Sequence, residues 1–144
     1  MTTPIENFIC FNFYTGWREV DQFYKQVLGN DISPQITYVL QLCHRKTDTT
    51  VKQIANDMNL NSSAVSSLIA RMEKNNLVER IHDLKDRRVV NVRLTEEGVK
   101  LKNRLKGKIK KLEAMISSGI NEQELNTLKK IVNSVTQSRI SNHN

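Results

Sequence analysis

The chain has 144 residues, of which 38% are hydrophobic and only 5 are Gly and 2 Pro, so one mainly helical domain is expected rather than disorder. No run approaches the roughly 18 apolar residues of a membrane-spanning helix, and residues 1–12 lack the basic start and cleavage site of a signal peptide. These features predict a cytoplasmic protein that does not associate with membranes. Cys10 and Cys43 are too few for a disulfide scaffold and lack metal-ligand spacing to the histidines, so no metal or other cofactor is expected.

The net charge of +7 is concentrated in one segment. Residues 71–111 hold 14 Lys and Arg against 6 Asp and Glu, whereas the rest of the chain holds 8 basic and 9 acidic side chains. A localised positive charge is typical of a protein that binds a polyanion such as nucleic acid, although membrane surfaces and simple solubility also favour it.

Residues 5–28 carry apolar side chains at three- and four-residue spacing, which predicts one long helix. Its first turns are apolar on more than one side, because Cys10, Phe11 and Tyr14 lie off the main stripe. A helix with two apolar sides needs two partners, so we expect this helix to form part of a subunit interface.

Ser33 and Pro34 predict the start of a second helix, with Ser33 as its N-cap and Pro34 at its first position. Cys43 lies on the apolar stripe of this helix and is expected to be an inert thiol in the core. The polar segment 46–50 then reads as a break. Residues 51–77 follow as two short amphipathic helices separated by "MNLN", which is the spacing of a helix-turn-helix.

The solvent side of the second short helix carries small hydroxyl side chains with one cation, where surface helices usually carry Glu and Lys. Short side chains let a helix approach another molecule closely, and hydroxyl groups can contact phosphates or base edges. A Ser-rich exposed face without a function is the alternative. The residues on this side are Ser62, Ser63, Ser66, Ser67, Ala70 and Arg71.

Two β-rich segments, 77–81 and 89–94, flank the charged stretch "HDLKDRR" and predict a β-hairpin with its tip at that stretch. A charged hairpin tip is ordinarily a solvated one. A helix-turn-helix that is followed directly by a hairpin is, however, a winged helix, in which the hairpin is the wing.

The C-terminal third predicts two more helices. Thr95 caps the first, which has a narrow apolar seam among lysines, and Asn121 with Glu124 forms a capping box for the last. The expected fold is therefore mainly α with a small β-hairpin wing, a winged helix-turn-helix bracketed by N- and C-terminal dimerisation helices. We assign 1–32 to the N-terminal dimerisation helix, 33–94 to the DNA-binding core and 95–144 to the C-terminal dimerisation helices, within one compact domain that forms an obligate homodimer.

The stretch "ERIHDLKDRRVVNVRLTEEG", residues 79–98, resembles the wing signature of the MarR family of dimeric winged-helix transcription regulators, and the likeness extends over nearly the whole chain. The resemblance implies that Arg88 enters the minor groove, that Asp86 fixes its direction and that the serine-bearing helix enters the major groove. A guanidinium that a carboxylate already holds loses little rotamer freedom in a narrow, electronegative A·T-rich minor groove. The expected partner is double-stranded DNA with a pseudo-palindromic operator, contacted by Ser62, Ser63, Ser66, Ser67, Arg71, Lys85, Asp86, Arg87 and Arg88.

The stretch "FICFNFYTGWREVDQFYKQ", residues 8–26, is similar to the branch of the family that senses organic hydroperoxides through a thiol. The resemblance makes Cys10 the sensing thiol and Tyr24 its contact, and oxidation would release the DNA. Because 14 helical residues span about 21 Å, Tyr24 could reach only the Cys10 of a partner subunit. The chain departs from the branch at Ser33, where a second tyrosine stands, and it has no resolving cysteine near its C-terminus. A small cellular thiol or the partner's Cys10 would then complete the disulfide.

Other functions stay open at this point. Cys10 is also compatible with simple packing in an interface. A regulator of the same family could instead respond to a small aromatic or anionic ligand, in a pocket lined by Tyr14, Trp17 and Tyr38, and a winged-helix module could bind only proteins. An enzyme is not expected, because no nucleophile, base and orienting group form a recognisable motif.

Overall fold

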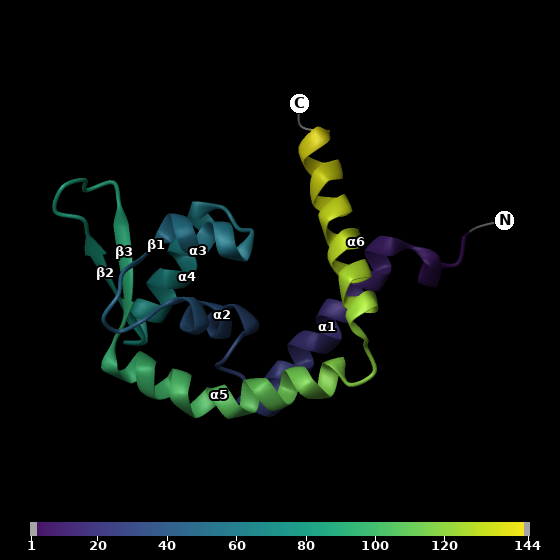
Figure 1. Cartoon of the computed structure of the whole chain (residues 1–144), viewed down its shortest axis with the longest axis horizontal. Helices are drawn as coiled ribbons and strands as arrows, with labels where there is room; N and C mark the ends of the chain where they lie inside the picture. Colours follow the sequence, from purple (N-terminus) through teal and green to yellow (C-terminus); the bar gives the residue numbers. More distant parts are fainter. Residues whose placement is uncertain (1–2, 143–144) are drawn as a thin grey trace. The chain divides into compact units, whose positions relative to one another are not determined.

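The computed structural model describes residues 3–142, which form six α-helices, one short 3₁₀-helix and a three-stranded sheet (Figure 1). The predicted class, mainly α with a small β-hairpin wing, is confirmed. None of the described helices is long and apolar enough to cross a membrane. The elements are η1 (Ile5–Asn7), α1 (Ile9–Leu28), α2 (Pro34–Leu42), β1 (Thr49–Thr50), α3 (Val51–Met58), α4 (Ser62–Lys74), β2 (Val78–His82), β3 (Val90–Leu94), α5 (Glu96–Ser117) and α6 (Glu122–Ser141).

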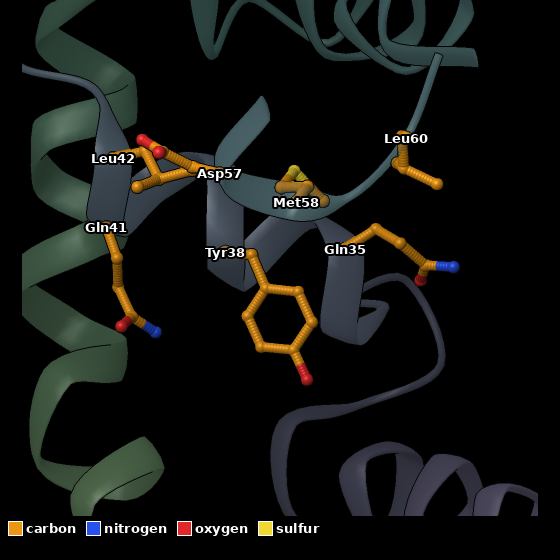
Figure 2. A pocket seen from close by; sticks show the side chains of 7 residues that line it. All are labelled: Gln35, Tyr38, Gln41, Leu42, Asp57, Met58 and Leu60. Atoms are coloured by element: carbon orange, nitrogen blue, oxygen red, sulfur yellow. The ribbon is translucent and has the colours of Figure 1, made fainter. Parts of the chain in front are cut away.

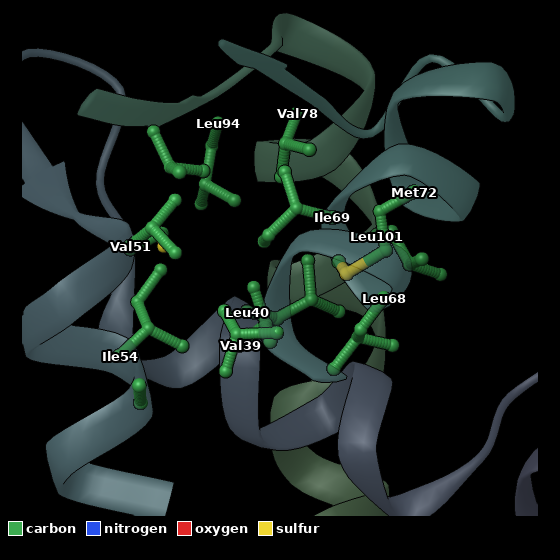
Figure 3. Close-up of a cluster of buried hydrophobic side chains, with 14 of the residues drawn as sticks. Val39, Leu40, Val51, Ile54, Leu68, Ile69, Met72, Val78, Leu94 and Leu101 are labelled. Atoms are coloured by element: carbon green, nitrogen blue, oxygen red, sulfur yellow. The ribbon is translucent and has the colours of Figure 1, made fainter. Parts of the chain in front are cut away.

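The chain divides into two compact units, one that runs to Ile109 and one that begins at Lys110. The first unit holds the winged core, defined here as residues 34–105. Its helices α2, α3 and α4, the first turns of α5 and the sheet bury one continuous set of apolar side chains (Figure 3). Each fully buried aliphatic side chain contributes about 1.5 to 3 kcal/mol to folding. The completely buried members include Val39, Leu40, Ile54, Val65, Ile69, Met72, Val92 and Leu94.

Side chains at the helix starts define where each helix of the core begins. Ser33 accepts a hydrogen bond from the Ile36 N–H at the start of α2, and Thr95 accepts one from the Gly98 N–H at the start of α5, as predicted. Thr50 forms a capping box with Gln53 at the start of α3. These bonds satisfy N–H groups that have no partner inside the helix.

The sheet has the strand order β1-β3-β2 with antiparallel pairing throughout. Val78 pairs with Leu94 at the base of the β2–β3 hairpin, and His82 pairs with Val90 at its far end. The expectation of a plain polar break at 46–50 was wrong, because Thr49 and Thr50 form β1 against β3. A strand of two residues is too short to show the alternation by which strands are recognised in a sequence.

The expectation of one helix over 5–28 was wrong at its start. Phe8 has an extended backbone, with φ −79° and ψ 128°, and separates η1 from α1. The Asn12 side chain donates to the carbonyls of Glu6 and Phe8 at 2.7 and 2.8 Å, which satisfies carbonyl groups at this interruption. A 3₁₀ turn followed by a helix keeps nearly the same apolar spacing as one continuous helix, so the pattern could not separate them.

The close approach of the Leu77 backbone explains why residue 98, three residues after the cap of α5, is a glycine. A Cβ at this position would lie 2.0 Å from the backbone oxygen of Leu77. The same oxygen accepts the Thr95 N–H at 3.0 Å, and the Thr95 hydroxyl donates to the Asn76 carbonyl. The first turn of α5 therefore lies directly against the base of the hairpin.

Two groups of apolar side chains have no cover in the single chain. In η1, in the first half of α1 and at Phe8 between them, the large apolar side chains are 48% to 61% exposed at Ile5, Phe8, Ile9, Tyr14 and Trp17. In α6 no described residue is buried, although Asn121 and Glu124 form the predicted capping box. The exposed apolar side chains of α6 are Leu125, Leu128, Ile131, Val132, Val135 and Ile140.

Candidate nucleic-acid interface

The two sides of α4 differ sharply in character. Asn61 caps the helix by accepting the Ala64 N–H at 2.7 Å. Val65, Leu68, Ile69 and Met72 are buried on one side. The other side presents the predicted residues Ser62, Ser63, Ser67 and Arg71 to solvent, with Ser66 half-buried. The helix can therefore approach a flat partner with short hydroxyl side chains along its outer surface.

The wing tip is ordered by two carboxylates. Asp83 accepts the backbone N–H groups of Lys85 and Asp86 at 2.8 and 3.1 Å, which folds the turn. Asp86 in turn accepts the backbone N–H and the Nε–H of Arg88, both at 3.0 Å, and its Nη2–H at 3.2 Å. The guanidinium and then the backbone N–H of Arg88 hold the pKa of Asp86 below its ordinary value.

Arg88 is thus both exposed and oriented. Its side chain is 91% exposed, yet the carboxylate of Asp86 holds the guanidinium through two hydrogen bonds. In a bidentate pair of this kind the planar guanidinium is positioned before any ligand binds. Within residues 3–142, Lys85 and Arg87 have no recorded ion pair, and the Arg87 carbonyl lies 3.2 Å from Nδ1 of His82.

A hollow of about 470 Å³ brings the serine side of α4 and the wing together. Its walls include Ser62 and Ser66 from α4 and Arg88 from the wing, which are three of the residues predicted to contact DNA. Ser63, Ser67, Arg71, Lys85, Asp86 and Arg87 lie outside it. The other lining residues are Thr50, Val51, Lys52, Arg80, Val89 and Val90.

Lys52 and Arg80 are candidate functional residues that the sequence analysis missed. Arg80 is held by Glu73 at the end of α4, which accepts its Nη2–H at 3.0 Å, its Nε–H at 3.3 Å and its backbone N–H at 3.2 Å. The pKa of Glu73 is lowered, chiefly because its carboxylate accepts hydrogen bonds from the Arg80 side chain. Glu73 and Arg80 are seven residues apart in the chain. As with Asp86 and Arg88, one carboxylate accepts hydrogen bonds from both the guanidinium and the backbone N–H of an arginine. The alternation of side chains along β2 was the signal that could have placed Arg80 beside α4.

Further ion pairs link the strands on which the wing is built. Asp48 pairs with Arg93 of β3 and raises the pKa of that guanidinium. Arg45 lies 3.6 Å from Glu79 of β2. All four side chains are partly exposed, so solvent screens both pairs and each contributes little to stability.

The predicted redox residues lie in different surroundings. Cys10 is exposed on α1, whereas Tyr24 is 1% exposed and so is buried within its own chain. The structure does not bring the two together. Cys43 is fully buried, and burial raises the pKa of its thiol to about 11 against smaller opposing effects of Lys102 and Thr49. An unreactive Cys43 agrees with the prediction.

Across residues 3–142, no three His, Cys, Asp or Glu side chains are grouped closely enough to hold a metal ion. His143, one of the three histidines without metal-ligand spacing to the cysteines, lies outside the described residues.

Comparisons with known proteins agree with this geometry. The MarR family model matches residues 32–90. The organic hydroperoxide resistance transcriptional regulator of Bacillus subtilis (strain 168) is 34% identical over 102 residues, which cover 69% of each chain. The chain belongs to the MarR family. The HTH-type transcriptional repressor MdtR of the same organism is 35% identical over 95 residues, 65% of this chain and 61% of that one. This MarR-family chain is a DNA-binding transcription regulator, as its relatives are regulators and not enzymes.

Solved structures show the same fold. The complex of S. aureus MepR with DNA superimposes with a TM-score of 0.75 at 25% identity and covers 91% of this chain and 98% of that one. The PcaV regulator from Streptomyces coelicolor, solved with its natural ligand, reaches a TM-score of 0.84 at 14% identity and covers 96% and 99%. The predicted winged helix-turn-helix is therefore confirmed, while the roles of individual residues stay predictions.

Proposed function

We propose that this MarR-family regulator is a cytoplasmic repressor that binds a pseudo-palindromic operator as a homodimer. The observation that carries the proposal is the hollow in which Ser62, Ser66 and Arg88 meet. In this arrangement α4 enters the major groove, and the wing places Arg88 in the adjacent minor groove. Lys52 and Arg80 add positive charge beside the same duplex.

The apolar faces of η1, α1 and α6 support the homodimer. In a monomer, large side chains on these faces, such as Trp17 and Leu128, would be about half exposed. Exposed apolar patches of this extent are typical of subunit interfaces. A two-fold axis would repeat the α4 and wing surface, so two half-sites about one helical turn apart are expected.

Two variants test the roles of the wing and the helix. Arg88→Ala should weaken binding to the DNA upstream of the protein's own gene by several-fold to a hundred-fold, and should reduce the preference for A·T at the wing position. Ser66→Ala should change base preference without changing the salt dependence, because a hydroxyl neutralises no phosphate. Lys46→Ala serves as the control for lost charge outside the hollow. Equal, sequence-independent losses for Arg88→Ala and Ser66→Ala would contradict these roles.

The proposed signal is oxidation of Cys10. The Cys10 thiolate attacks the O–O bond of an organic hydroperoxide, which gives a sulfenic acid and, after protonation, an alcohol. A small cellular thiol then displaces water to form a mixed disulfide. Support comes from the exposure of Cys10, from the burial of Cys43 and from the likeness to a hydroperoxide resistance regulator. A bulky adduct on α1 would disturb a packed interface and thereby the spacing of the two α4 helices.

Tyr24 has a smaller part in this proposal than the resemblance implied. It would have to leave its buried position, or open its surroundings, to reach a partner's Cys10. The experiment compares Cys10→Ser with Cys43→Ser in a gel shift with cumene hydroperoxide, followed by dithiothreitol. Release should disappear only in Cys10→Ser and should reverse with dithiothreitol in the wild type. If Cys10→Ser still releases DNA on oxidation, the thiol mechanism is wrong.

A second candidate signal is a small aromatic ligand. A hollow of about 430 Å³ opens beside the ring of Tyr38, between α2 and the end of α3 (Figure 2). Tyr14 and Trp17, which were also considered for a ligand pocket, do not line it. Asp57 makes it a poor site for an anion, so a neutral or cationic aromatic compound fits better. The lining residues are Gln35, Tyr38, Gln41, Leu42, Asp57, Met58 and Leu60.

This candidate is tested with unoxidised protein. A screen of small aromatic amines in the gel shift should yield compounds that release DNA from the wild type and from Cys10→Ser alike. Tyr38→Ala should remove that response, because it removes the aromatic ring among the lining residues of the hollow. A screen without releasing compounds, alongside release by hydroperoxide, would favour the thiol mechanism.

A further inference from the structure

The positive charge of this chain does not lie mainly where the operator contacts lie. Residues 71–95, which include the end of α4 and the wing, hold 7 basic and 4 acidic residues, a balance of +3. Residues 96–111, the first turns of α5, hold 7 basic and 2 acidic residues, a balance of +5. More than half of the charge that indicates a polyanion partner therefore belongs to α5.

Three of these cations form a stripe on one flank of α5. Lys100, Arg104 and Lys108 are four residues apart in turn, so they project from the same side of the helix over about 12 Å. All three are exposed, while Leu101 and Leu105 on the neighbouring side are buried in the core. We call these three residues the α5 stripe.

The α5 stripe borders a hollow of about 260 Å³. Lys100 and Arg104 line it together with the amide side chains of Asn75 and Asn76, which supply further donors for an oxyanion. Glu97 also lines it and pairs with Lys100 at 3.3 Å. For Arg104 and Lys108 no ion pair is recorded anywhere in residues 3–142. The remaining lining residues are Leu77 and Leu101.

The stripe lies at the opposite end of the hairpin from the wing tip. Val78 and Leu94 pair at the base of the hairpin, and the five-residue strands carry the tip about 13 Å or more beyond it. The contacts of Thr95 and Gly98 with Leu77 attach the start of α5 to that base. In Figure 1 the tip and the first turns of α5 accordingly lie at opposite ends of the β2–β3 hairpin. A duplex seated against Ser62, Ser66 and Arg88 is therefore not the natural partner of the stripe.

We propose that the α5 stripe is a second DNA-binding surface, which holds a separate duplex while α4 and the wing hold the operator. Lysine and arginine side chains without aromatic or aliphatic anchors recognise a phosphate backbone without reading its sequence. An acidic protein surface fits less well, because protein interfaces depend on buried apolar or aromatic anchors and the stripe offers none. The second surface requires the stripe to stay open in the proposed dimer, and the cost of burying charged side chains such as Arg104 and Lys108 in an interface favours this.

A capture experiment tests this surface. Beads carry the DNA upstream of the protein's own gene, the full chain is bound to it, and a fluorescent duplex of mixed sequence is then added at low salt. The wild type should retain the second duplex, and the variant Lys100→Gln, Arg104→Gln, Lys108→Gln should lose at least ten-fold of that capture while its operator affinity changes by less than about two-fold. The control Lys46→Gln, Lys106→Gln, Lys110→Gln removes the same charge elsewhere and should keep the capture.

The outcomes separate this inference from the operator proposal. Operator binding without capture by the wild type, or equal capture by the stripe variant and the control, would overturn the second surface. Displacement of the captured duplex by polyglutamate as readily as by unlabelled DNA would assign the stripe to an acidic protein and also overturn it. The capture is repeated with Arg88→Ala protein fixed directly on beads, so a failure of operator recognition leaves the result for the stripe intact.

Discussion

The winged core and the helix α6 begin with equally good local signals and end in opposite environments. Thr50 with Gln53 forms a capping box in the core, and Asn121 with Glu124 forms the same box at the start of α6. In the core the apolar sides of the helices are closed by one another and by the sheet. In α6 no described residue is buried, and the apolar side chains from Leu125 to Val135 are 40% to 49% exposed.

The difference shows that helix signals and tertiary partners are separate properties. Caps and apolar spacing determine where a helix begins and which side is apolar, but they do not say what covers that side. The core supplies its own cover. A second subunit, as in the proposed homodimer, would cover the exposed apolar side of α6. Each prediction below would sharpen or contradict this contrast.

The largest effect is expected from Gly98→Ala. The new Cβ would meet the Leu77 backbone oxygen at 2.0 Å, and neither backbone can move without separating α5 from the hairpin. We expect a loss of more than about 3 kcal/mol in the free energy of unfolding, measured by urea titration. The control is Gly107→Ala, where nothing lies within 4 Å and a helix interior gains up to about 1 kcal/mol. Equal stability of the two variants would show that α5 does not pack tightly on the core.

A smaller but still large effect separates Ile69 from Ile131. Ile69 is fully buried, so Ile69→Ala should cost about 2 to 5 kcal/mol at every protein concentration. Ile131 is 40% exposed in the single chain, so Ile131→Ala should weaken the dimer instead and make Tm more dependent on concentration. Thermal unfolding at two protein concentrations measures both. A concentration-independent loss for Ile131→Ala would mean that no second subunit covers α6.

Much of the fold was predictable because its signals are local. Ser33, Thr95 and Asn121 were identified as caps, and all three accept the expected N–H groups. The paired strands of the hairpin were predicted within one or two residues. The breakdown of the first helix at Phe8 and the short strand β1 were missed, because the first depends on the Asn12 side chain and the second on pairing with β3.

The candidate site was only partly predictable. Asp86 and Arg88 are neighbours in the sequence, so their pairing follows from a short turn. Arg80 lies on the strand β2 and Glu73 on the helix α4, so their contact depends on how β2 packs against α4. A charge count over the sequence can assign most of the positive charge to residues 96–111, but it cannot tell that the start of this helix lies at the base of the hairpin, because that position depends on tertiary contacts with Leu77.

The two thiols should differ at least a hundred-fold in their rate of alkylation by iodoacetamide. Cys43 is fully buried with a pKa of about 11, so about one molecule in a thousand carries its thiolate at pH 8. Cys10 is exposed. Mass spectrometry of the labelled peptides measures both rates. Because Cys43 binds its proton more tightly in the folded state, its contribution to stability should be lost as pH rises from about 9 towards 11, and Cys43→Ala should remove that loss.

The smallest effect per site is expected from the two matched caps, and it bears most directly on where α6 obtains its order. Thr50→Ala and Asn121→Ala each remove one N-cap side chain, which costs about 1 kcal/mol. In the core the loss should lower the free energy of unfolding and leave dimer dissociation unchanged. If α6 is ordered only in the dimer, each dissociation event involves two Asn121 caps, so Asn121→Ala should cost about 2 kcal/mol and raise the dissociation constant about thirty-fold. Sedimentation equilibrium of the two variants measures this directly. An unchanged dissociation constant for Asn121→Ala would show that α6 is already folded in the monomer. A second subunit would then cover the apolar side of α6 without being required for the helix to fold.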